Sequence, residues 1–133
     1  MKWQLYSDGA SRGNPGPSGA GALLINEKGE EFPLTFYLGI KTNNQAEYEA
    51  LLLGLRELKK RGAQEVEVRA DSELLIKQLN GIYRVKHENI IPLFQEAKEI
   101  SKAFKKISFQ HIPREENKQA DRLSNEAIDF RNL

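Results

Sequence analysis

The order of apolar and polar positions predicts three strands at the start of the chain. Residues 2–7 alternate, with Trp3 and Leu5 on one face, which is the period of a half-buried strand. A dense turn signal rich in Gly and Pro follows at residues 11–19, and a hairpin signal stands at residues 26–29. The two strands on either side of that hairpin are expected at residues 20–26 and 32–39. These three strands can pair as an antiparallel meander.

A long amphipathic helix is predicted over residues 43–61. Its large apolar residues recur at helical spacing: Tyr48, Leu51, Leu52, Leu55 and Leu58. Thr42 and Gln45 match a capping box at its start, and Gly62 is a natural stop at its end.

The second half of the chain alternates between strands and helices. The expected elements are a strand at 65–70, a short helix ending near Leu79, a helix at 87–104, a strand at 107–112 and a last helix from Glu115 or Glu116 to Phe130. A strand–helix–strand succession favours parallel pairing. The sequence therefore predicts an α/β fold with a mixed five-stranded sheet and helices packed against it.

The length and composition narrow the class of protein. The 133 residues suffice for one domain with its own core, expected over residues 1–133. No cysteine is present, which excludes disulfides, thiolate zinc sites and cysteine nucleophiles. The start of the chain is too polar for a secretory signal, and no apolar run could span a bilayer. We expect a cytoplasmic monomer with no membrane partner and no organic cofactor.

Four acidic residues mark a candidate site. Asp8 and Asp71 close two strands, Glu47 lies early in the long helix, and Asp121 lies in the last helix. Each alone has an ordinary explanation, such as a turn residue, a helix cap or a solvated helix residue. Together they would repel one another at one sheet crevice, and hard cations such as Mg²⁺ or Mn²⁺ relieve such repulsion. Two metals about 4 Å apart suit hydrolysis of a phosphodiester.

Four segments carry a resemblance to a known family. They are Tyr6-Ser7-Asp8-Gly9-Ala10-Ser11-Arg12-Gly13-Asn14-Pro15-Gly16, Thr42-Asn43-Asn44-Gln45-Ala46-Glu47, Ala70-Asp71-Ser72 and His111-Ile112-Pro113-Arg114-Glu115-Glu116-Asn117-Lys118-Gln119-Ala120-Asp121. In this order they resemble the conserved blocks of type 1 ribonucleases H. The likeness runs from residue 1 to about 128.

The resemblance implies a fold, an activity and a metal site. The fold is a mixed sheet in the order 3-2-1-4-5. The activity is hydrolysis of the RNA strand of RNA–DNA hybrids by two Mg²⁺ or Mn²⁺ ions, which leaves 5′-phosphate and 3′-hydroxyl ends. The residues matching the metal-binding carboxylates are Asp8, Glu47, Asp71 and Asp121.

The resemblance also implies substrate contacts. The residues that match them are Arg12, Gly13, Asn14, Thr42, Asn43, Asn44, Gln45 and Ser72. Amides suit a minor groove, because they donate to and accept from 2′-hydroxyls and base edges. Ordinary alternatives stay open: Asn43 as a helix cap, Gly13 as a turn residue, and Arg12 as a solvated side chain.

The chain departs from many bacterial members at two points. The segment containing His111 and Arg114 resembles the shorter archaeal-like branch, so Arg114 is favoured over His111 as the residue assisting the metals. The basic protrusion that grips the hybrid is absent, and net charge is only +1. Affinity for nucleic acid must then come from local contacts. A non-catalytic or weakly active nucleic-acid-binding module on the same fold is the alternative.

Overall fold

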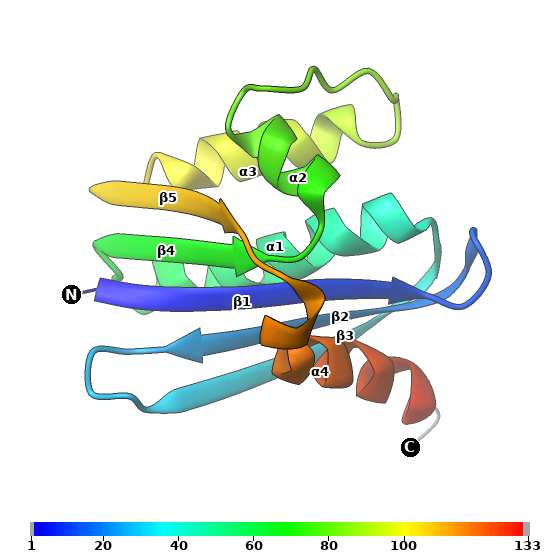
Figure 1. Ribbon diagram of the computed structural model, residues 1–133, viewed down its shortest axis with the longest axis horizontal. Coiled ribbons are helices and arrows are strands. Elements are labelled where there is room, and N and C mark those ends of the chain that lie inside the picture. The colour runs from blue at the N-terminus through cyan, green and yellow to red at the C-terminus, as the bar shows by residue number, and fades with distance from the viewer. Residues whose placement is uncertain (1, 132–133) are drawn as a thin grey trace.

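The computed structural model describes residues 2–131 (Figure 1). Its elements are β1 (Lys2–Ser11), β2 (Gly16–Ile25), β3 (Glu31–Lys41), α1 (Asn43–Lys60), β4 (Glu65–Ala70), α2 (Glu73–Leu79), α3 (Ile91–Ser101), β5 (Lys106–His111), the 3₁₀ turn η1 (Arg114–Glu116) and α4 (Lys118–Asp129). Met1, Asn132 and Leu133 of the expected domain lie outside the described residues.

The five strands form one mixed sheet in the order β3-β2-β1-β4-β5, as the sequence predicted. Strands β1, β2 and β3 pair antiparallel, whereas β4 pairs parallel with both β1 and β5. The central strand β1 therefore has an antiparallel neighbour on one side and a parallel neighbour on the other. This arrangement brings the carboxyl ends of β1 and β4 to the same edge of the sheet.

Helices cover the two faces of the sheet unequally. Figure 1 shows α1 behind the sheet and α4 in front of it. The apolar face of α1 packs on the sheet to form the main core, which includes Leu5, Leu51, Leu55 and Val68. Trp3 belongs to this core, as its alternation in the sequence predicted. Among the described residues, no helix is both long and apolar enough to cross a membrane.

Glycines on β2 let α4 approach the sheet closely. A Cβ on Gly19 would lie 2.2 Å from the carbonyl oxygen of Ser124, and one on Gly21 would lie 2.4 Å from that of Ala120. Both distances are far shorter than van der Waals contact. The position of α4, which carries Asp121, thus depends on the absence of side chains at these two positions.

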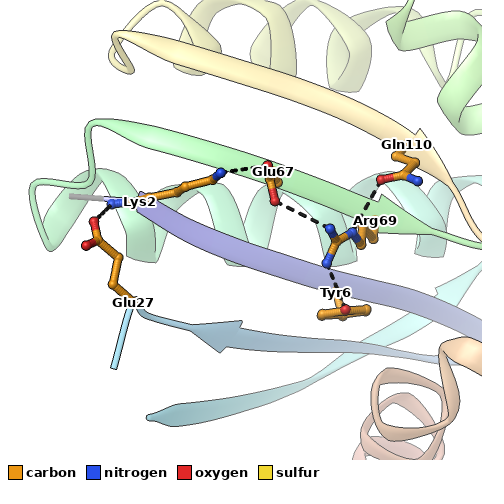
Figure 2. Close-up of polar contacts among 6 residues, drawn as sticks. All are labelled: Lys2, Tyr6, Glu27, Glu67, Arg69 and Gln110. Atoms are coloured by element: carbon orange, nitrogen blue, oxygen red, sulfur yellow. Dashed lines mark hydrogen bonds and ion pairs between the residues drawn. The ribbon is translucent and has the colours of Figure 1, made fainter. Parts of the chain in front are cut away.

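The half of the front face formed by β1, β4 and β5 carries a polar network instead of a helix (Figure 2). Arg69 is its centre: its guanidinium donates to the hydroxyl of Tyr6 at 3.0 Å and to Gln110 at 3.4 Å. Glu67 joins Arg69 at 3.4 Å to Lys2 at 3.1 Å. These cross-strand contacts tie β4 to both of its neighbours.

Several element boundaries differ from the sequence prediction. The turn expected over residues 11–19 is much shorter, because β1 and β2 continue pairing and the Arg12 N–H donates to the Pro17 carbonyl at 2.9 Å. The helix expected from residue 87 begins at Ile91, with a proline in its first turn, where a missing N–H costs nothing. The last helix begins at Lys118, after the 3₁₀ turn η1.

Replacement of Gly21 by Ala tests the packing of α4. The new methyl group would overlap the backbone of α4, so we expect the free energy of unfolding to fall by about 1–3 kcal/mol. Urea denaturation followed by circular dichroism measures the change. Thr35→Ala, at the exposed position paired with Gly21 on β3, is the matched control. Equal stability of Gly21→Ala and wild type would contradict the close packing.

Candidate metal centre

The strand register places two of the predicted carboxylates side by side. Ser7 pairs with Ala70 at the end of the parallel ladder between β1 and β4, so Asp8 and Asp71 follow side by side. The sequence predicted that Asp8 closes the first strand, but β1 continues to Ser11 because it still pairs with β2 there. One carboxylate oxygen from each of Asp8, Glu47 and Asp71 lies within 4.8 Å of the others. The structure thus brings together acids that are far apart in the chain: 39 positions separate Asp8 from Glu47, and 24 separate Glu47 from Asp71.

Glu47 reaches this cluster because α1 crosses β1 in close contact. A Cβ on Gly9 would lie 2.1 Å from the backbone carbon of Ala46, so only glycine permits the crossing. The Gly9 N–H donates to Oε1 of Glu47 at 2.6 Å, and the Glu47 side chain is buried. The strand therefore fixes the orientation of the helix carboxylate.

Asp121 completes the cluster from the opposite side of the sheet. It lies in the first turn of α4 and lines the same cleft, of about 440 Å³, as the other three acids. Asp121 is not part of the group of three acids whose carboxylate oxygens lie within 4.8 Å of one another, but its side chain helps to raise the pKa of Asp8. Four acids, carried by β1, α1, α4 and the residue that follows β4, thus line one cleft.

Burial and mutual repulsion disfavour the ionised forms of these carboxyl groups when no cation is bound. Burial, followed by repulsion from Glu47 and the effect of the Asp121 side chain, raises the pKa of Asp8 to about 10. Burial also raises the pKa of Glu47 to about 7, although the Gly9 N–H opposes the shift. Such a cluster holds either protons or cations near neutral pH. An all-oxygen ligand set suits hard divalent cations, so the residues fit Mg²⁺ or Mn²⁺.

Arg114 and His111 occupy different places. Arg114, in η1, lines the acidic cleft, whereas His111 is not among the residues that line it. His111 lies at the end of β5, where, after Lys77, it contributes to lowering the pKa of Glu73. Of the two residues, Arg114 is the one that lines the cleft, and its role as the assisting residue stays a prediction.

The amides predicted to contact substrate lie beside the acidic cleft. Asn43 lines the cleft itself, while Asn14, Thr42 and Asn44 line an adjacent hollow of about 230 Å³ together with Asn89. Asn43, which lines the cleft, is bonded to Asn14, which lines the adjacent hollow: the Asn43 N–H donates to the Asn14 side-chain carbonyl at 3.0 Å. The first turn of α1 and the β1–β2 turn therefore act as one polar surface.

Four of the residues predicted to contact substrate have structural partners within the chain. Gln45 and Thr42 form the expected capping box, with bonds of 2.9 and 3.2 Å. Ser72 caps α2 by accepting from the Leu75 N–H at 3.2 Å. Arg12 pairs with Asp129 at 2.7 Å, so it is not the unpaired side chain that the sequence alone allowed.

Gly13 has φ +93°, a conformation that favours glycine, so the interpretation as a turn residue has direct structural support.

Two asparagines near the metal cluster were missed as site residues in the sequence. Asn125 donates to the Asp121 carbonyl at 3.0 Å and lines the cleft. Asn117 donates to Asp71 at 3.1 Å from a buried position. The signal available was their spacing of four residues on either side of Asp121, which places all three along one side of a helix.

Comparisons with known proteins agree with this geometry. A family model described as reverse transcriptase-like matches residues 6–127. A bifunctional protein of Mycobacterium tuberculosis is 39% identical over 131 residues, which cover 97% of this chain but 36% of that protein. Ribonuclease HI of Halobacterium salinarum is 41% identical over 127 residues, 93% of this chain and 63% of that protein. The chain thus spans only part of the length of these relatives.

One similar solved structure is a complex. A ribonuclease H1 known as LC11, crystallised with an RNA/DNA hybrid, is 42% identical and has a TM-score of 0.92. The match covers 98% of this chain and 99% of that chain.

The raised pKa values predict how stability depends on pH in metal-free protein. Folding raises the pKa of Asp8 from 3.8 to about 10 and that of Glu47 from 4.5 to about 7. The folded state then binds more protons than the unfolded state between these values, so stability falls as pH rises through that window. We expect the free energy of unfolding to be lower at pH 8 than at pH 5.5, and Asp8→Asn to raise it at pH 8 by roughly 2 kcal/mol.

Chemical denaturation in the presence of a chelator measures both effects. Asp129→Asn is the matched control, because Arg12 lowers the pKa of that exposed carboxyl and its removal should give a small loss rather than a gain. An Asp8→Asn variant less stable than wild type at pH 8 would contradict the repulsion described here.

Proposed function

Because the chain belongs to the type 1 ribonuclease H family, we propose that it hydrolyses the RNA strand of RNA–DNA hybrids. The observation that carries the proposal is the acidic cleft, in which oxygens of Asp8, Glu47 and Asp71 lie within 4.8 Å of one another and Asp121 lines the same space. The solved complex of a 42% identical ribonuclease H1 with an RNA/DNA hybrid supports the choice of substrate.

The four carboxylates would bind two Mg²⁺ or Mn²⁺ ions. Such ions activate a water molecule and stabilise the leaving oxygen, which would leave a 5′-phosphate and a 3′-hydroxyl end. The protein contributes the geometry: the Gly9 N–H holds Glu47, the β1–β4 register places Asp8 beside Asp71, and α4 brings Asp121. Cations would relieve the repulsion that helps to raise the pKa values of Asp8 and Glu47, and their binding would displace protons from these carboxyl groups.

Arg114 is the residue we propose to assist at the cleft. A guanidinium stays charged at neutral pH and cannot act as a general base. It can donate to the scissile phosphate or help the product leave. His111, at the end of β5, is the less suitable candidate, because it is not among the residues that line the cleft.

The amide-lined surface would recognise the hybrid. Asn14, Asn43 and Asn44 present side-chain donors and acceptors beside the acidic cleft, where the minor groove would approach. Gln45 and Thr42 support the surface through the capping box, and Ser72 supports the strand end that carries Asp71. Arg12 pairs with Asp129 through Nη1 and donates to Asn125 from Nη2, and its remaining N–H donors would be available to a phosphate.

We expect the affinity for the RNA–DNA hybrid to be modest. The connector between α2 and α3 exposes Arg84 and Lys86 but holds no dense basic cluster, and the chain has a net charge of +1. Weak, salt-sensitive binding follows from so few phosphate contacts. We further propose that residues 1–133 act as one domain, as a monomer in the cytoplasm. The presence of all four carboxylates in one cleft favours catalysis over a role as a non-catalytic binding module.

Two glutamates on α1 offer a matched test of the activity. Glu47→Gln removes a carboxylate of the cluster, so we expect cleavage of the RNA strand to fall by at least about a hundredfold. Glu49→Gln is the same change two residues away, at a side chain outside the cleft, and should retain activity. The assay uses hybrids with end-labelled RNA or DNA, in Mg²⁺, Mn²⁺ or chelator.

Cutting of the RNA strand alone, which stops in chelator and leaves 5′-phosphate ends, is the expected result. Failure of the wild-type protein to cut with either metal, at concentrations high enough to offset weak binding, would favour the binding-module alternative.

A pair of alanine variants separates the two assisting candidates. Arg114→Ala should lower kcat by at least about tenfold, because it removes a charged donor from the cleft. His111→Ala should change kcat much less. Multiple-turnover cleavage at saturating hybrid measures kcat for both variants. A larger loss in the His111 variant would reverse the assignment.

A further inference from the structure

Asn117 occupies a buried junction between the sheet and the helix that carries Asp121. It lies between η1 and α4, and its side chain is 1% exposed. Buried amides are costly unless their polar atoms are paired. The contacts of this side chain therefore indicate why an amide is present there.

Both contacts of the Asn117 side chain use its amide nitrogen. Nδ2 donates to the carbonyl oxygen of Ser7 at 2.9 Å and to Oδ1 of Asp71 at 3.1 Å. Both partners are pure acceptors, so the reverse orientation of the amide would set oxygen against oxygen. The chemistry of the partners thus fixes the orientation of the amide group.

The two bonds link β1 to the residue that follows β4, at positions that belong to the acidic cluster or adjoin it. Ser7 immediately precedes Asp8, and the second bond reaches the Asp71 carboxylate itself. The main chain adds a third link, since the Asp121 N–H donates to the Asn117 carbonyl at 3.0 Å. One residue is therefore bonded to the elements that carry three of the four acids.

The remaining polar atom of Asn117 argues against a purely structural role. Its Oδ1 is buried and has no hydrogen-bond partner among the described residues. An apolar side chain of similar size would avoid this unpaired acceptor. The amide is thus a poor choice for packing alone, and its two donor contacts are what an apolar side chain could not supply.

We infer that Asn117 is a positioning residue for the metal centre: its amide orients the Asp71 carboxylate and fixes it relative to Asp8. Partners that orient ligating carboxylates typically change metal affinity or activity tenfold to a hundredfold. The inference deepens the proposed function and rests on it for its catalytic consequence, but metal binding tests it independently of catalysis.

Asn117→Leu is the decisive variant, because leucine keeps nearly the same volume and removes both the donors and the unpaired acceptor. Titration calorimetry of metal-free protein with Mn²⁺ gives the affinity, and circular dichroism checks the fold. Asn117→Ala is measured in parallel, in case leucine does not fit. Gln78→Leu is the matched control: Gln78 is also buried and amide-bearing, but it accepts from the Tyr48 hydroxyl at 2.7 Å outside the cleft.

We expect both Asn117 variants to fold and to bind Mn²⁺ at least about tenfold more weakly than wild type. Gln78→Leu should bind Mn²⁺ as wild type does. In the cleavage assay, the Asn117 variants should lose kcat while KM for the hybrid stays close to the wild-type value.

Two results would overturn the inference. The first is that both Asn117 variants fold and bind Mn²⁺ with the same affinity as the wild type. The other is an equal loss of affinity in Gln78→Leu, which would indicate general destabilisation. A wild-type protein that binds Mn²⁺ without cutting hybrids would contradict the proposed function, while the affinities of the variants would still decide the role of Asn117.

Discussion

The parallel pairing of β1 with β4 is the constraint on which the site depends. It sets Ser7 opposite Ala70, so the next residue on each strand is an aspartate at the same edge of the sheet. On its other side β1 pairs antiparallel with β2, whose glycines let α4 approach and deliver Asp121. A slip of one residue in either ladder would turn these side chains to the opposite face. The strand register therefore determines which acidic side chains lie together in the cleft.

This register concentrates negative charge at a cost in stability. Asp8 and Glu47 are buried beside other acids, and their pKa values rise because burial and repulsion disfavour the charged forms. The surrounding structure offsets this with donors and close backbone packing: the Gly9 N–H holds Glu47, and the Asn117 amide holds Asp71. Such repulsion is typical of functional sites, which lose some stability in order to hold the side chains that bind a ligand.

Much of this arrangement could be predicted from sequence, since local signals specify it. The capping box at Thr42 and Gln45 and the alternation of β1 are read within a few residues, and the structure confirms both. Asp71 directly follows the end of β4 as predicted, whereas Asp8 lies within β1, because pairing with β2 extends that strand to Ser11. The length of the β1–β2 hairpin could not be predicted, because a Gly- and Pro-rich segment reads as a turn whether or not its backbone pairs. The pairing of Arg12 with Asp129 and the bonds of Asn117 join residues far apart in the chain, so they become visible only once α4 is placed on the sheet.

The central claim is that these carboxylates form a cation site, and anomalous X-ray scattering from crystals grown with Mn²⁺ tests it most directly. The account predicts strong anomalous density between Asp8, Glu47 and Asp71, with a second peak about 4 Å away in the same cleft. The Glu47→Gln variant should lose occupancy at the same positions. Crystals of folded wild-type protein at millimolar Mn²⁺ with no density in this cleft would contradict the account, and the fold would then serve another purpose.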